Sequence, residues 1–168
     1  MKKKIVLIFS FFLLPFSVTL AQNEMFKALF MYNFTKNVEW PADMRQGDFV
    51  IVVFGDSPVV GELEKIAASK KVGQQNIVVK KVDNANAIGK CHILYLPEGK
   101  SSSFGPALSA VEGKPVLLVT DKSGLAQQGA CINYVTVGGK LNFEINKSRF
   151  QKQGLQMASA LANLGIVI

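Results

Sequence analysis

The chain has 168 residues, of which 49% are hydrophobic, and a formal net charge of +7 at pH 7. This length suits one ordinary domain with a substantial hydrophobic core. Three of the positive charges lie in the first four residues, and the +4 that remains without them gives no reason to expect a nucleic-acid partner.

The first 21 residues are typical of a secretory signal peptide. Three lysines precede the apolar run Ile5–Leu20, and Thr19 and Ala21 are small residues at the −3 and −1 positions of a cleavage site. The alternative is a transmembrane anchor, but the run of about 16 residues is shorter than the roughly 20 that span a bilayer. No cysteine follows it to carry a lipid. We therefore expect residues 1–21 to be cleaved and residues 22–168 to form a single exported domain.

A helix is expected over residues 24–39. Apolar residues recur every four positions from Phe26 to Val38, which gives the helix one broad apolar face. Pro41 ends the helix, because the residue before a proline is pushed out of the α region.

Strands and helices alternate in the next part of the chain. Residues 48–55 are nearly all apolar and β-branched, as in a strand buried on both faces of a parallel sheet. Ser57 as N-cap and Pro58 at the first position predict a helix over residues 57–70. Further strands are expected over residues 75–82, 91–97 and 114–120, with a short helix over residues 106–111.

The C-terminal part predicts a hairpin and a last helix. After a turn at residues 121–129, strands over residues 131–137 and 140–146 are joined by a Gly-Gly pair, which is a two-residue hairpin signal. Ser148 and Gln151 form a capping box that predicts a helix over residues 148–164.

This alternation predicts an α/β fold. We expect a mostly parallel sheet of about five to six strands, a C-terminal antiparallel hairpin, and helices on both faces of the sheet.

Cys91 and Cys131 are the only cysteines, and an exported protein permits a disulfide between them. Both begin predicted strands at the same end of the sheet. A flavodoxin-like strand order places the strand of residues 114–120 between them, so their Cα atoms would lie about 9.6 Å apart, beyond the limit of about 7 Å for a disulfide. The bond requires another strand order or irregular strand starts. The alternative is two small buried hydrophobic residues.

Catalytic and metal motifs are weak in this sequence. Gly99-Lys100-Ser101 resembles the end of a phosphate-binding loop, but Leu94 stands where that loop needs its first glycine. His92 is the only histidine, and its neighbour Cys91 points to the opposite face of the same strand, so the two cannot share a metal. No clustered acid, base or nucleophile is visible. We expect no enzyme activity, no cofactor and no metal site.

Polar and aromatic residues outside the expected core are candidates for binding a partner or ligand. One group lies on or beside the first helix, where aromatic residues among charges are typical of binding surfaces, although they also occur at core edges. Asp56 lies at the carboxyl end of the first strand, where α/β proteins bind ligands, although a plain helix cap also explains it. Two residues lie on the hairpin, where polar groups usually protect a sheet edge. The candidates are Tyr32, Asn33, Lys36, Glu39, Trp40, Asp56, Glu144 and Asn146.

Five segments in order resemble the YfiR-like family of periplasmic regulatory proteins. The helix opening with a Lys-Ala pair and continuing to Tyr-Asn-Phe and Glu-Trp-Pro resembles the start of that family, and a Phe-Glu-Ile-Asn segment followed by Gly-Leu resembles its end. The resembling segments are Lys27–Pro41, Phe54–Pro58, Cys91–Leu96, Gly129–Val135 and Phe143–Ser159, and they cover nearly all of the chain after residue 21.

The resemblance implies an α/β protein of the periplasm that can form a homodimer. The best-known family members hold an inner-membrane diguanylate cyclase inactive by binding its periplasmic region, and they release it on redox or envelope stress. Those members carry more cysteines than the two found here. By this resemblance we expect a regulator whose partner is an inner-membrane signalling protein with a periplasmic sensor region. The alternative is a periplasmic small-molecule-binding protein.

Overall fold

A computed structural model describes the backbone of residues 16–168 and the side chains from residue 22 onward. Most of the expected signal peptide, residues 1–15, lies outside the described part of the chain. The helix α1 (Phe16–Asn37) begins within the last residues of that segment and continues beyond it. Within the described range, no helix combines the length and the apolar character needed to cross a membrane.

The chain forms a mixed eight-stranded sheet, which confirms the α/β class but not the expected five to six mostly parallel strands. The order is β10-β8-β7-β6-β5-β2-β4-β3, and the β7–β8 and β3–β4 pairs are antiparallel. Two-residue strands at both edges account for the difference, because they are too short to show a periodic pattern. The strands are β2 (Phe49–Phe54), β3 (Lys71–Val72), β4 (Gln75–Val82), β5 (Ile93–Leu96), β6 (Leu117–Thr120), β7 (Ile132–Val137), β8 (Lys140–Ile145) and β10 (Ile166–Val167).

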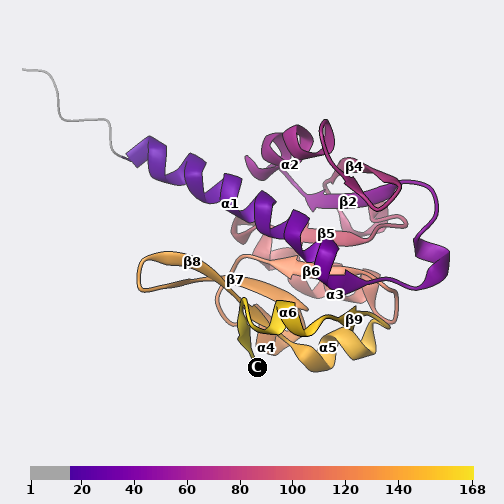
Figure 1. Cartoon of the computed structure of the whole chain (residues 1–168). Coiled ribbons are helices and arrows are strands. Elements are labelled where there is room, and N and C mark those ends of the chain that lie inside the picture. The colour runs from indigo at the N-terminus through magenta and orange to yellow at the C-terminus, as the bar shows by residue number, and fades with distance from the viewer. Residues whose placement is uncertain (1–15) are drawn as a thin grey trace, which may run out of the picture.

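The remaining elements connect these strands (Figure 1). The helices are α2 (Val59–Ala67), α3 (Phe104–Val111), α4 (Leu125–Gln128), α5 (Lys147–Lys152) and α6 (Ser159–Ala162), with the 3-10 turns η1 (Ala42–Met44), η2 (Ala85–Ala87) and η3 (Glu98–Ser103). One buried hydrophobic cluster runs through the sheet and beneath α1 and α2.

Aromatic packing joins α1 to the C-terminal hairpin. In Figure 1, α1 crosses the front of the sheet. The Phe34 ring lies 5.0 Å from Phe143 and 6.2 Å from Tyr134, which face each other across the β7–β8 pair. Phe30 packs on the same two rings at 5.4 and 6.4 Å. The expected apolar face of the first helix therefore covers the expected hairpin.

A polar contact fixes the same helix at the carboxyl end of the sheet. The Lys27 ammonium lies 2.6 Å from both Glu24 and Asp121. The Tyr95 hydroxyl donates to Asp121 at 3.0 Å, and the Tyr134 hydroxyl donates to the Lys27 carbonyl at 2.8 Å. Burial alone lowers the pKa of Lys27, but its hydrogen bonds to Asp121 and Glu24 outweigh burial, so the pKa is raised. The ammonium stays charged between its two carboxylates.

The expected helix over residues 148–164 is wrong. The α5 helix ends at Lys152, and Gly154 adopts φ +65°, a left-handed conformation that stops a helix and turns the chain. The next residues form β9 (Gln156–Met157) instead. The capping box is also wrong, because Asn146 is the N-cap and its side chain accepts from the Arg149 backbone N–H at 3.0 Å.

A small second sheet joins the two ends of the domain. The first helix ends two residues earlier than expected, and Val38–Glu39 become β1, which pairs antiparallel with β9. Val38 lies opposite Met157, and Glu39 lies opposite Gln156. This pairing creates the pocket described next.

Candidate functional site: the pocket beside Trp40

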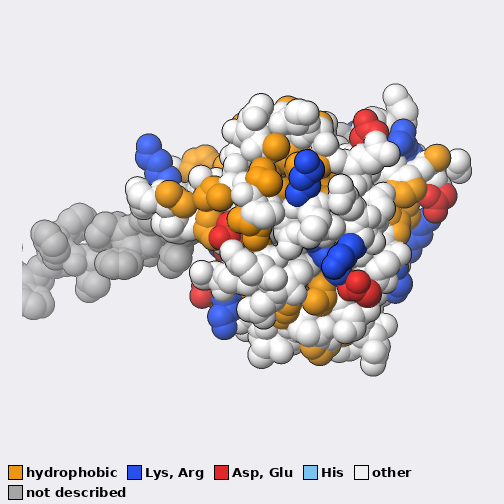
Figure 2. Space-filling view, turned by 90° about the horizontal axis from the view of Figure 1, so that it is seen from below, with side chains coloured by type: hydrophobic (Ala, Val, Ile, Leu, Met, Phe, Trp, Pro, Cys, Tyr) orange, Lys and Arg blue, Asp and Glu red, His pale blue; other side chains and the backbone are white. Residues whose placement is uncertain are grey.

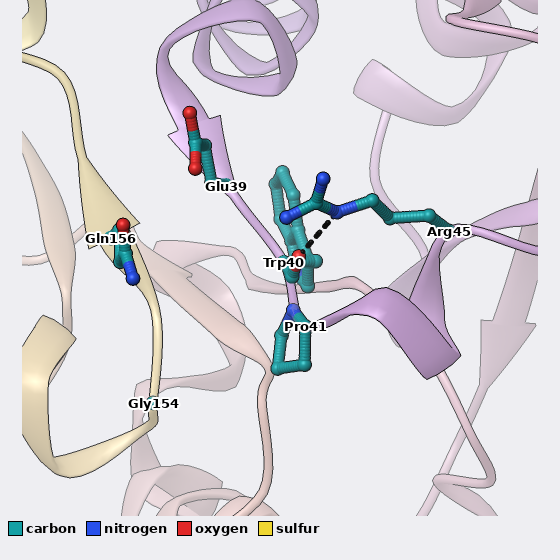
Figure 3. A pocket seen from close by; sticks show the side chains of 6 residues that line it. All are labelled: Glu39, Trp40, Pro41, Arg45, Gly154 and Gln156. Carbon is teal, nitrogen blue, oxygen red and sulfur yellow. Dashed lines mark hydrogen bonds between the residues drawn. The ribbon is translucent and has the colours of Figure 1, made fainter.

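A pocket of about 190 Å³ lies where β1, η1 and β9 meet. Figure 3 shows Glu39 and Gln156 on the neighbouring strands at one side and Arg45 at the other, with Trp40 and Pro41 between them. The lining residues are Glu39, Trp40, Pro41, Arg45, Gly154 and Gln156.

Trp40 forms the inner wall of the pocket. Its side chain is buried and meets the Phe49 ring edge-to-face at 5.0 Å. The indole Nε1 is also buried, and no residue in the described range accepts a hydrogen bond from it. An unpaired buried donor costs free energy. Trp40 is therefore a core residue that carries one unsatisfied polar atom beside the pocket.

The rim of the pocket carries both signs of charge. Glu39 and Arg45 are exposed, and the Arg45 Nε donates to the Trp40 carbonyl at 2.7 Å, which fixes the guanidinium over this side of the pocket (Figure 3). Gln156 adds a neutral amide. A carboxylate, a guanidinium and an amide around an aromatic wall suit binding of a small polar group or of a partner's side chain.

His92 lies on the inner side of Trp40. Its ring stacks on Phe49 at 4.2 Å and lies 5.9 Å from the Trp40 ring. The Val50 backbone N–H donates to its Nδ1 at 3.0 Å, and its Nε2 lies 2.6 Å from the Met44 carbonyl. The histidine thus connects η1 to the sheet beneath the pocket.

The other candidates on α1 lie along its exposed flank rather than in the pocket. The Lys36 ammonium lies 4.5 Å from the centre of the Tyr32 ring, a cation–π contact. Asn33 is exposed, and its carbonyl accepts from the Asn37 side chain at 2.9 Å. Of the five candidates on or beside the first helix, Glu39 and the buried Trp40 line the pocket, while Tyr32, Asn33 and Lys36 lie on α1 outside it.

The remaining candidates lie elsewhere. Asp56 is at the carboxyl edge of the sheet, where it pairs with Lys81 at 2.5 Å. Glu144 accepts weakly from Asn133 and Gln127, at 3.3 and 3.4 Å. Asn146 caps α5. The structure therefore does not bring Asp56, Glu144 and Asn146 together with the α1 candidates.

Four pocket residues were not among the candidates from the sequence: Pro41, Arg45, Gly154 and Gln156. Gly154 belongs to the Gly-Leu motif at the end of the chain, which is the one signal that could have marked it. The pairing of β1 with β9 over more than one hundred residues has no local signature.

Both cysteines are buried and free. Cys91 lies just before β5 and Cys131 just before β7, and β6 lies between these two strands. Burial raises the pKa of each thiol to about 12. Such thiols stay protonated at neutral pH and are poor nucleophiles. Over the described range, no three metal-ligating side chains gather into a potential metal site.

Large apolar side chains are exposed in three places: the N-terminal half of α1, the hairpin tip and the C-terminal segment. Figure 2 shows the face that carries the C-terminal segment, where apolar side chains lie scattered among polar atoms. The residues are Met25, Phe26 and Leu29 on α1, Val137 on the hairpin, and Leu164, Ile166, Val167 and Ile168 at the C-terminus.

Comparison with known protein families matches residues 24–165 to the family described as YfiR/HmsC-like. Comparison with curated proteins finds no match. The matched residues include every residue that lines the pocket and almost all of the sheet.

Proposed function

The chain belongs to the YfiR/HmsC-like family, and from this membership we propose that it is a periplasmic regulator, not an enzyme. It binds the sensor region of an inner-membrane signalling protein. By the same resemblance, the partner is a diguanylate cyclase that it represses, so that cyclic-di-GMP rises when the protein is removed. The observation that carries the proposal is a family match over nearly the whole domain.

The exposed flank of α1 is the surface we assign to the partner. It combines exposed Met25 and Leu29 with Tyr32 and Lys36 further along the helix. Aromatic and apolar side chains bordered by charge are typical of binding surfaces.

Site-specific photo-crosslinking tests this assignment. A photoreactive amino acid replaces Leu29, or Lys65 on the exposed side of α2 as a matched control. We expect position 29 to crosslink to a membrane protein with a periplasmic sensor region and position 65 not to do so. Deleting the gene should also raise cellular cyclic-di-GMP. Crosslinks from position 29 only to other copies of the chain, with cyclic-di-GMP unchanged, would overturn the proposal.

The pocket favours a second candidate function, the binding of a small molecule. Glu39 and Arg45 flank the Trp40 wall, and a pocket of about 190 Å³ has room only for a small ligand. Trp40 is the only tryptophan, so its fluorescence reports on this pocket alone. A ligand that binds there should change Trp40 emission and raise the melting temperature, and Arg45→Ala should abolish both effects.

A further inference from the structure

His92 joins three segments of backbone through one buried ring. The ring is 2% exposed. Its Nδ1 accepts from the Val50 N–H in β2 at 3.0 Å, and its Nε2 contacts the Met44 carbonyl in η1 at 2.6 Å. His92 itself directly precedes β5.

The two hydrogen bonds define the protonation state of the ring. Because Nδ1 accepts from an N–H, it carries no proton, and the ring proton of neutral histidine must then be on Nε2. Nε2 therefore donates to the Met44 carbonyl. Both contacts are satisfied only by the neutral ring with this proton position.

The η1 turn depends on these contacts and forms one side of the pocket. Its Met44 carbonyl also accepts from the Gln75 side chain at 3.1 Å. Pro41 and Arg45, which line the pocket, lie immediately before and after η1. A displacement of η1 from the sheet would therefore change the pocket.

A second ring proton is not compatible with this arrangement. It would place an Nδ1–H against the Val50 N–H, so that two donors face each other, and it would put a charge in a buried site. The charged groups on the neighbouring segments are Lys90 before β5, Asp43 and Arg45 at η1, and Asp48 before β2. Within the described residues, no carboxylate forms a hydrogen bond or ion pair with the ring.

The pKa of His92 follows from these surroundings. Burial lowers it, the contact with the Met44 carbonyl acts in the opposite direction, and the Lys90 charge lowers it further, so that the pKa lies below its ordinary value.

We propose that His92 makes the pocket beside Trp40 sensitive to pH. Neutral His92 holds η1 against the sheet, whereas protonated His92 still has a donor for the Met44 carbonyl but can no longer accept from the Val50 N–H, so the charged ring leaves its buried site, η1 moves away from the sheet and Trp40 becomes exposed. The proposal concerns the pocket itself, so it holds whether the occupant is a protein partner or a small molecule. Acidification is the stimulus that it predicts.

Quenching of Trp40 fluorescence by acrylamide tests the proposal in the purified protein. Trp40 is the only tryptophan, so the fluorescence comes from this residue alone. His92 is the only histidine, so no other histidine titrates in the same pH range. Between about pH 8 and about pH 5, across the ordinary histidine pKa, we expect quenching to rise reversibly while the far-ultraviolet circular dichroism stays constant. Quenching that stays flat until the dichroism is also lost would overturn the proposal.

Two variants separate His92 from other titrating groups. His92→Gln does not titrate in this range, so its quenching should be independent of pH, and a pH profile like that of the wild type contradicts the proposal. Lys90→Gln removes the positive charge before β5 and should shift the midpoint of the wild-type profile to higher pH. If His92→Gln does not fold, the titration of the single histidine followed by NMR decides the question, because a quenching midpoint that differs from the His92 titration midpoint contradicts the role of His92. Lys65→Gln on α2 is the matched control and should not shift the midpoint.

Discussion

At the scale of single residues, Trp40 combines a large buried area with one polar atom that has no partner. Trp40→Ala should lower the free energy of unfolding by about 3–5 kcal/mol, because the ring leaves a cavity beside Phe49 and His92. Trp40→Phe should cost less than about half of that, since it keeps most of the ring volume and removes the unpaired Nε1–H. Urea denaturation measures both values. Equal losses for the two variants would show that the indole N–H is satisfied.

The two cysteines give a second test at this scale. Because Cys91 and Cys131 are buried thiols with a pKa of about 12, the native protein should react slowly with a thiol reagent. Both thiols should become reactive in denaturant without a reductant. A denatured protein that shows no thiol until it is reduced would instead demonstrate the disulfide between them.

At the scale of elements, the turn at Gly154 determines where the C-terminal segment goes. Gly154→Ala should destabilise the protein by about 1 kcal/mol or more, because its φ of +65° is unfavourable for a residue with a side chain. Gly61→Ala is the matched control. Gly61 lies inside α2 with no atom within 4 Å of an added Cβ, so this change should stabilise by up to about 1 kcal/mol. Thermal unfolding of the two variants should therefore move in opposite directions.

The Lys27 contact holds the N-terminal half of α1 to the sheet. Lys27→Met should cost up to about 3 kcal/mol, since Asp121 and Glu24 would lose the cation they share while mostly buried. Lys65→Met removes a similar but exposed ion pair with Glu62 and should change stability by less than about 0.5 kcal/mol. Urea denaturation compares the two. A similar effect of both changes would show that the Lys27 cluster is solvated.

The elements predicted from the sequence are those whose pattern is long enough to read. The four-residue spacing from Phe26 to Phe34 and the Gly-Gly pair of the hairpin each identified their element. The helix expected over residues 148–164 was wrong although its apolar residues fit one face of a helix. Gly154 adopts a left-handed conformation, which ends the helix and which the apolar spacing does not reveal. Strands of two residues, such as β1 and β9, have no period at all.

At the scale of the whole molecule, stability should depend on pH through His92. Its folded pKa lies below the unfolded value of about 6.5, so its contribution is complete above that pH and is lost as pH falls towards the folded pKa. The urea midpoint should be constant between about pH 7 and pH 8.5 and lower near pH 5.5. His92→Gln should reduce that loss. A midpoint that falls equally in both proteins would assign the loss to carboxylates.

The candidate site was predicted only in part, because tertiary contacts bring residues that are far apart in the sequence into one pocket. Glu39 and Trp40 were identified because aromatic residues among charges beside the first helix are typical of a binding surface. Arg45 and Gln156 reach the same pocket only through tertiary contacts, and a sequence read in local windows does not contain that information. Asp56 was placed correctly at a carboxyl strand end, but the described pocket lies at the other end of β2, beyond Phe49.

The pairing of β1 with β9 also determines when the pocket can form during folding. The pocket needs Glu39 and Gln156 together, and contacts so far apart in sequence form late. A chain shortened before residue 154 contains the first helix and the central strands but lacks Gly154 and Gln156, and so lacks the pocket. Binding of a ligand in the pocket would therefore distinguish complete chains from shortened ones.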